Sequence, residues 1–136
     1  MFLLDTNVIS ETRKQRPHGG VIEFLEARKP SELFISAVSI GEMQEGVEMT
    51  RLQNPEKANE IEDWISQTVD NFPILPMDAN TFREWAVLMQ GKSGDLTMDA
   101  MIAATARVNR LTVVTRNTKD FATFHVLTLN PFVSKP

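Results

Sequence analysis

Short apolar runs alternate with amphipathic stretches along most of the chain. The runs at residues 2–4, 33–38, 72–75, 111–115 and 126–129 are bounded by turn-forming residues, and several are rich in β-branched side chains. These are the features of strands, and the run at 111–115 shows them most clearly.

Between these runs, apolar residues recur at helical spacing. The pattern predicts helices near 8–11 and over 21–27, 39–52, 54–69, 78–89 and 97–108. Strands that alternate with such helices form right-handed βαβ units. We therefore expect an α/β fold, a three-layer α/β/α sandwich with a mostly parallel central sheet. The apolar sides of the helices at 21–25 and 58–69 fit either the core or a partner contact, and the core is the simpler interpretation.

Length and composition fit one domain over residues 1–136. With 42% apolar residues the chain can bury one ordinary core. It has no cysteine and only two histidines, which excludes thiolate metal sites and a cysteine nucleophile. Any metal is therefore expected to be held by oxygen atoms.

The charge balance restricts the possible partners. A formal net charge of −4 argues against a protein that coats nucleic acid through a broad basic surface, but not against a nuclease with an acidic, metal-binding cleft. Arg13, Lys14 and Arg16 form one basic cluster that suits either phosphate contact or a solvated loop. No apolar run is long enough to span a membrane and the start lacks a signal peptide, so we expect a cytoplasmic protein.

Candidate chemistry comes from acidic residues that lie far apart in sequence. Asp5, Glu42, Asp99 and Asp120 each follow an apolar run or fall in the opening turn of a predicted helix. In parallel sheets such positions meet beyond the carboxyl ends of the strands. Crowded carboxylates repel each other unless a cation neutralises them, so their gathering predicts a site for a hard divalent metal.

Each acid also has an ordinary structural interpretation. Asp5 fits a strand-end or Asx turn, Glu42 completes a capping box with Ser39, Asp99 favours a helix dipole, and Asp120 fits a plain loop. Only their joint placement on one edge favours a metal site. Thr6 and Thr115 stand beside these acids, where their hydroxyls either fix a carboxylate or serve the local turns.

Four segments together carry a specific resemblance. They resemble, in order and spacing, the motifs of the PIN-domain ribonucleases, specifically the VapC and FitB-like toxins of type II toxin–antitoxin systems. The segments are Phe2–Glu11, Ile35–Gly46, Met98–Ala106 and Val114–Phe121, and the end of the chain, Leu129–Phe132, is similar to the tail of the same group.

The resemblance implies a metal site and its members. Asp5, Glu42 and Asp99 are its central catalytic and metal-binding acids, and the fourth position is either Asn117 or Asp120. Because Asn117 is neutral, Asp120 is favoured as the charged member, with Asn117 as a carbonyl ligand or supporting group. The cofactor implied is Mg²⁺ or Mn²⁺.

The same resemblance implies an activity and partners. The expected activity is that of an endoribonuclease toxin that hydrolyses RNA phosphodiester bonds with metal-activated water. The expected partners are RNA, a cognate antitoxin and a second copy of the chain, with operator DNA reached only through the antitoxin and no membrane. The alternative is a non-catalytic metal-binding regulatory module of the same fold, which the neutral Asn117 keeps open.

Overall fold

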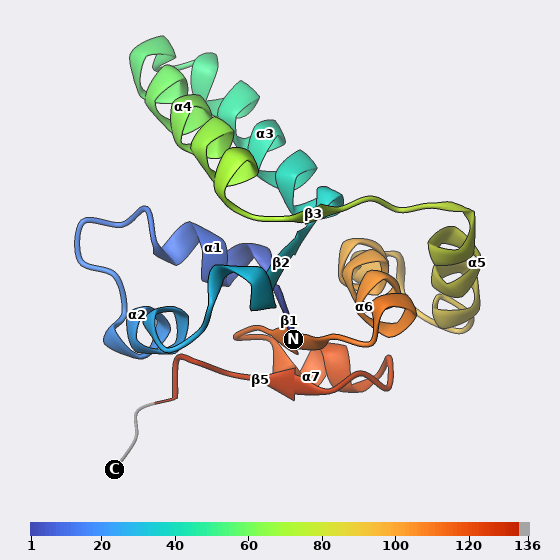
Figure 1. Ribbon diagram of the computed structural model, residues 1–136. Coiled ribbons are helices and arrows are strands. Elements are labelled where there is room, and N and C mark those ends of the chain that lie inside the picture. The colour runs from blue at the N-terminus through green and yellow to red at the C-terminus, as the bar shows by residue number, and fades with distance from the viewer. Residues whose placement is uncertain (134–136) are drawn as a thin grey trace.

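The computed structural model describes residues 1–133, and a parallel sheet lies at the centre of the molecule (Figure 1). Its five strands follow the order β3-β2-β1-β4-β5, and every pairing is parallel. The strands are β1 (Phe2–Leu4), β2 (Leu33–Ser36), β3 (Ile74–Leu75), β4 (Thr112–Val114) and β5 (Thr128–Leu129).

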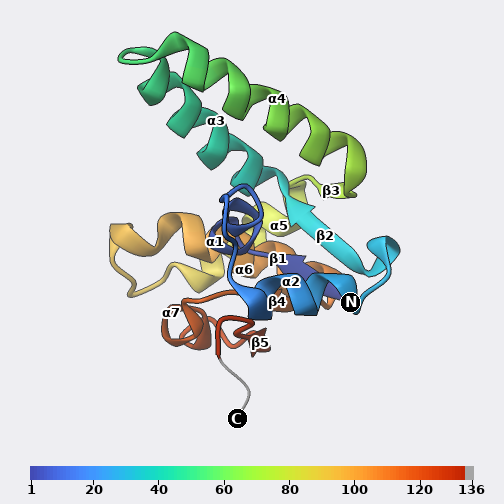
Figure 2. The same cartoon turned by 90° about the vertical axis from the view of Figure 1, so that its left-hand side faces the viewer.

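Helices connect successive strands. They are α1 (Thr6–Glu11), α2 (Gly19–Glu26), α3 (Ala37–Arg51), α4 (Pro55–Asn71), α5 (Ala79–Leu88), α6 (Thr97–Asn109) and α7 (Thr118–Ala122), with short 3-10 turns at Pro30–Glu32 and Gly94–Leu96. Figures 1 and 2 show α3 and α4 side by side, projecting away from the sheet. Within residues 1–133, none of these helices combines the length and apolar character needed to cross a membrane.

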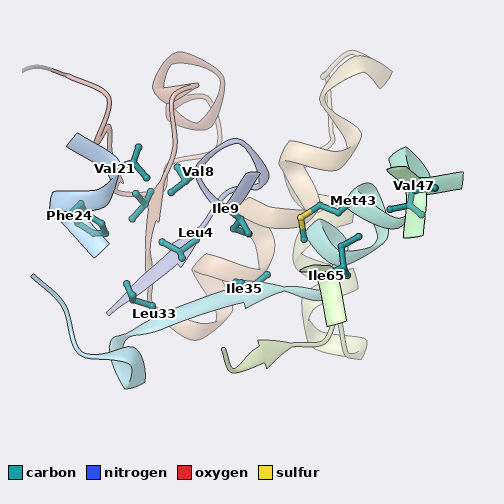
Figure 3. Packing of buried hydrophobic residues seen from close by; sticks show 12 residues of the cluster. Leu4, Val8, Ile9, Val21, Phe24, Leu33, Ile35, Met43, Val47 and Ile65 are labelled. Atoms are coloured by element: carbon teal, nitrogen blue, oxygen red, sulfur yellow. The ribbon is translucent and has the colours of Figure 1, made fainter. Parts of the chain in front are cut away.

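Alternating side chains of the strands place one core on each face of the sheet. Leu4, Ile35 and Val114 pack with buried residues of α1 to α4, the cluster drawn in Figure 3. Their neighbours Leu3 and Val113 point to the other face and pack with α6 and α7. This period of two confirms the predicted α/β/α sandwich, although the sheet is wholly rather than mostly parallel.

The strand order determines where a crevice can form. The chain builds β1, β2 and β3 outward in one direction and then returns to place β4 on the other side of β1. The order therefore reverses between β1 and β4, and the carboxyl ends of these two strands border the position where open α/β sheets bind ligands.

Helix starts explain where the predicted boundaries were right and wrong. Asn54 and Asp78 cap α4 and α5 as predicted, accepting the backbone N–H groups of Lys57 at 3.1 Å and Thr81 at 2.9 Å. The predicted strand at 33–38 instead ends at Ser36, which caps α3 by accepting the N–H of Val38 at 3.1 Å. The capping box of Ser39 and Glu42 was therefore wrong, because both residues lie inside the helix.

The apolar sides of α2 and α4 lie mainly in the core. Val21 and Phe24 of α2 and Ala58 and Ile65 of α4 are buried, whereas Val69 near the end of α4 is 40% exposed. This confirms the core interpretation of both stripes.

The residue after α6 offers a first testable prediction. Arg110 ends the helix in the left-handed region with φ of 56°, where a side chain is disfavoured by about 1 kcal/mol. We expect Arg110→Gly to raise the free energy of unfolding by about 0.5–1 kcal/mol in urea titrations. Arg110→Ala, which also removes the guanidinium but keeps Cβ, should show no such gain. Equal midpoints for the two variants would contradict this explanation.

Candidate functional site

Asp5 lies at the reversal point of the sheet and is almost fully buried. It follows β1 directly, is 4% exposed and caps α1, its Oδ1 accepting the N–H of Thr6 at 2.8 Å. Its Oδ2 accepts the hydroxyl of Thr115, which follows β4, at 2.7 Å and the side-chain amide of Asn7 at 3.2 Å. Burial raises the pKa of Asp5, and the hydrogen bonds from Thr115 and Thr6 oppose that rise. The carboxylate is thus fixed in place by both strands.

Glu42 approaches the same edge from the second turn of α3. It is partly buried, and its Oε1 accepts the hydroxyl of Thr6 at 3.0 Å, while the same hydroxyl lies 2.8 Å from Ser39 Oγ. Burial raises the pKa of Glu42 most, and the charges of Asp5 and Glu45 raise it further. The hydroxyls of Thr6 and Thr115 therefore do fix carboxylates.

Asp99 carries the strongest electrostatic signal. It lies in the first turn of α6 and is partly buried. Burial raises its pKa to about 6, with further contributions from the charges of Asp5, Asp120 and Glu42. Four carboxylates from distant segments therefore repel each other here, which is the situation that a bound cation relieves.

The fourth position lies at the start of α7. Asp120 is in the first turn and exposed, and its charge contributes to the raised pKa of Asp99. Asn117 caps the helix, but its side chain makes no capping hydrogen bond; its backbone N–H donates to Thr115 Oγ1 at 2.9 Å. The negative charge of Asp120 thus acts on Asp99, whereas the side chain of Asn117 makes no hydrogen bond within residues 1–133.

These residues suit a hydrated hard cation better than a closed metal cage. Among residues 1–133, no three His, Cys, Asp or Glu side chains are gathered tightly enough to form a ready-made cage. Mg²⁺ keeps several waters and is commonly held by only one or two carboxylates. The all-oxygen donor set and its mutual repulsion fit this mode of binding.

The sequence did not predict the roles of two residues on the segment after Asp5, Glu11 and His18. Glu11 at the end of α1 is only 5% exposed and pairs with Lys14 Nζ at 2.7 Å, so it organises the basic loop. The Nδ1 of His18 caps α2 by accepting the N–H of Gly20 at 3.0 Å. The sequence signal for this cap was the position of His18 directly before a Gly-Gly helix start.

Comparisons with known proteins agree with this fold and cover almost the whole chain. The family model described as "PIN domain" matches residues 2–125. "Toxin FitB" of Neisseria gonorrhoeae is 33% identical, with 97% of this chain and 99% of the relative covered. "VapC ribonuclease Y4jK" of Sinorhizobium fredii is 30% identical, with 97% and 98% covered.

The similarity extends to three dimensions. A chain of the solved "Structure of FitAB bound to IR36 DNA fragment" superposes with a TM-score of 0.85 at 33% identity, covering 100% of this chain and 99% of that one. By its domain match, its relatives and its parallel-sheet architecture, the chain belongs to the PIN domain family.

Proposed function

We propose that this protein is a Mg²⁺- or Mn²⁺-dependent endoribonuclease and the toxin of a type II toxin–antitoxin pair. The observation that carries the proposal is the meeting of carboxylates from distant segments at the reversal point of the sheet. Thr115 and Thr6 hold Asp5 there, and Thr6 also binds Glu42. Burial and then the charges of Asp5, Asp120 and Glu42 raise the pKa of Asp99 at the same place. The relatives named as a toxin and a ribonuclease add support.

Each acidic residue has a distinct role in this proposal. Asp5 and Asp99 hold the cation, and Asp120 or Asn117 completes its surroundings. When bound, the cation supplies Lewis-acid stabilisation of phosphate charge and lowers the pKa of water. Glu42, whose pKa is raised chiefly by burial, is suited to accept the proton of the attacking water.

The hydroxyl groups maintain this geometry. Thr115 and the Thr6 N–H hold the two oxygens of Asp5, and the Thr6 hydroxyl holds one oxygen of Glu42. Each carboxylate oxygen can accept more than one contact, so these bonds fix the groups and still leave lone pairs for a cation. Fixed ligands need no reorganisation during the reaction, which is the advantage of a preorganised site.

The partners follow from the relatives. A solved relative is named as FitAB bound to a DNA fragment, and another, 27% identical, is named as a toxin–antitoxin complex from Klebsiella pneumoniae. We infer a cognate antitoxin for this chain, with operator DNA reached only through it, since the chain itself is acidic. The resemblance to these toxins also supports a homodimer.

Metal dependence is the direct test. Protein freed of co-purifying partner should cut RNA when Mg²⁺ or Mn²⁺ is added and lose that activity in EDTA, measured on labelled RNA by gel electrophoresis. Asp5→Asn and Asp99→Asn should not cut. Cutting that persists in EDTA or in both variants would point to a contaminating nuclease.

A non-catalytic metal-binding module is the rival function. The neutral Asn117 is the feature that keeps this rival open. A metal-stabilised protein that leaves every RNA intact would support this rival.

A further inference from the structure

A positively charged side chain, that of Arg116, lies beside the acidic site and has no role in the function proposed above. Arg116 follows Thr115 directly, and its backbone N–H donates to Asn7 Oδ1 at 3.3 Å. Its side chain is exposed and forms no ion pair with any acidic group among residues 1–133. A guanidinium next to several carboxylates would be expected to pair with them, so something holds it away.

An aromatic ring accounts for that position. The guanidinium carbon of Arg116 lies 3.8 Å from the centroid of the Phe132 ring. The ring of His18 also contacts Phe132, at 5.3 Å between ring centroids. A guanidinium stacked on a ring keeps its N–H donors at the edge, free to bind a planar or tetrahedral anion.

Glu11 has a weaker, electrostatic influence on Arg116. This buried carboxylate pairs with Lys14 and accepts the N–H of His18 at 3.2 Å. The hydrogen bond from Lys14 is the main cause of its lowered pKa, and the charge of Arg116 also contributes, so the guanidinium lies within the field of Glu11. Arg116 is thus stacked on a ring and lies within reach of the negative charge of Glu11, beside the acidic site.

An RNA strand that enters a site of four carboxylates needs positive charge close by for its flanking phosphates. We propose that Arg116, positioned by its stack on Phe132, binds a backbone phosphate of the RNA strand beside the scissile one. This inference rests on the proposed ribonuclease function and names a substrate contact for it. The exposed guanidinium edge and the adjacent acidic site favour RNA phosphate over an acidic side chain of a protein partner.

The experiment measures RNA binding without cleavage. In the full-length chain carrying Asp99→Asn, fluorescence anisotropy with a short fluorescein-labelled single-stranded RNA is recorded over a series of salt concentrations. Arg116→Ala should weaken binding about ten-fold and reduce the slope of log affinity against log salt by about 0.7, the contribution of one phosphate contact on a single strand. Arg116→Lys should restore the slope but not the full affinity, because an ammonium lacks the stacked, forked geometry.

Two variants separate position from charge. Phe132→Leu keeps an apolar side chain and the guanidinium, so affinity should fall about three-fold while the salt slope stays near the parent value. Arg110→Gly, at the other end of α6 from Asp99, removes the same charge and should leave binding within about two-fold.

The outcomes distinguish this inference from the proposed function. Cleavage by the wild-type protein with Mn²⁺ tests the function, whereas the anisotropy series tests the phosphate contact. Unchanged affinity and slope in Arg116→Ala would overturn the inference even if the wild-type protein cuts RNA. The inference would also be overturned if Arg116→Ala bound RNA normally but no longer bound a protein partner, since Arg116 would then serve that partner.

Discussion

Asp99→Asn should abolish RNA cleavage and yet make the metal-free protein more stable. Removing a central carboxylate should lower the metal-dependent rate by roughly a hundred-fold or more. Stability should rise because the folded-state pKa of Asp99, about 6, lies above the unfolded value of about 3.9, so the ionised form is disfavoured by folding. After allowance for partial solvent screening, we expect a gain of about 1–2 kcal/mol at pH 7.

The size of this effect depends on pH. For a raised pKa, the stability associated with the protonated group is fully present below about pH 4 and is lost as pH rises through about 6. Wild type and Asp99→Asn should therefore differ little near pH 4 and most above pH 6 in urea titrations with EDTA. Asp95→Asn, the same change at an exposed position four residues earlier, should leave stability unaltered.

Metal should reverse the order of stabilities. A cation that binds only the folded state raises the unfolding temperature, so Mn²⁺ should stabilise the wild-type protein and have little effect on Asp99→Asn. An Asp99→Asn protein that is less stable than wild type in EDTA at pH 7 would contradict the idea that these carboxylates repel each other.

The fold was predictable because its signals are local. Apolar runs and helix caps such as Asn54 and Asp78 can be recognised from a few neighbouring residues. The alternation of strands with helices then predicts a parallel sheet. The boundary between β2 and α3 was misplaced because Ser36 and Ser39 are both good caps, and only the backbone shows which one accepts an N–H.

The candidate site was only partly predictable, because its contacts are long-range. The joint placement of Asp5, Glu42 and Asp99 follows from topology, but the bond between Asp5 and Thr115 spans 110 positions and has no local pattern. The stack of Arg116 on Phe132 likewise joins residues that no local sequence pattern connects. Burial, which raises the pKa of Asp99, is a property of the packed molecule and cannot be read from neighbouring residues.

Asp5→Ala should destabilise the metal-free protein by about 2 kcal/mol and abolish cleavage. The loss of the α1 cap costs about 1 kcal/mol, and the buried hydroxyl of Thr115 loses its acceptor at a further cost of about 1–3 kcal/mol. Relief of the buried charge, which raises the pKa of Asp5, offsets part of this sum. Urea titrations in EDTA at pH 7 measure the difference.

Asn54→Ala provides the matched control, because exposed Asn54 caps α4 by accepting the backbone N–H of Lys57 alone. It should cost only about 1 kcal/mol and leave cleavage intact. Equal losses in the two variants would mean that Asp5 acts as an ordinary helix cap, without an added contribution from Thr115. A stabilised Asp5→Ala protein would show instead that burial of the charge outweighs all three hydrogen bonds, so that Asp5, like Asp99, is retained at the expense of stability.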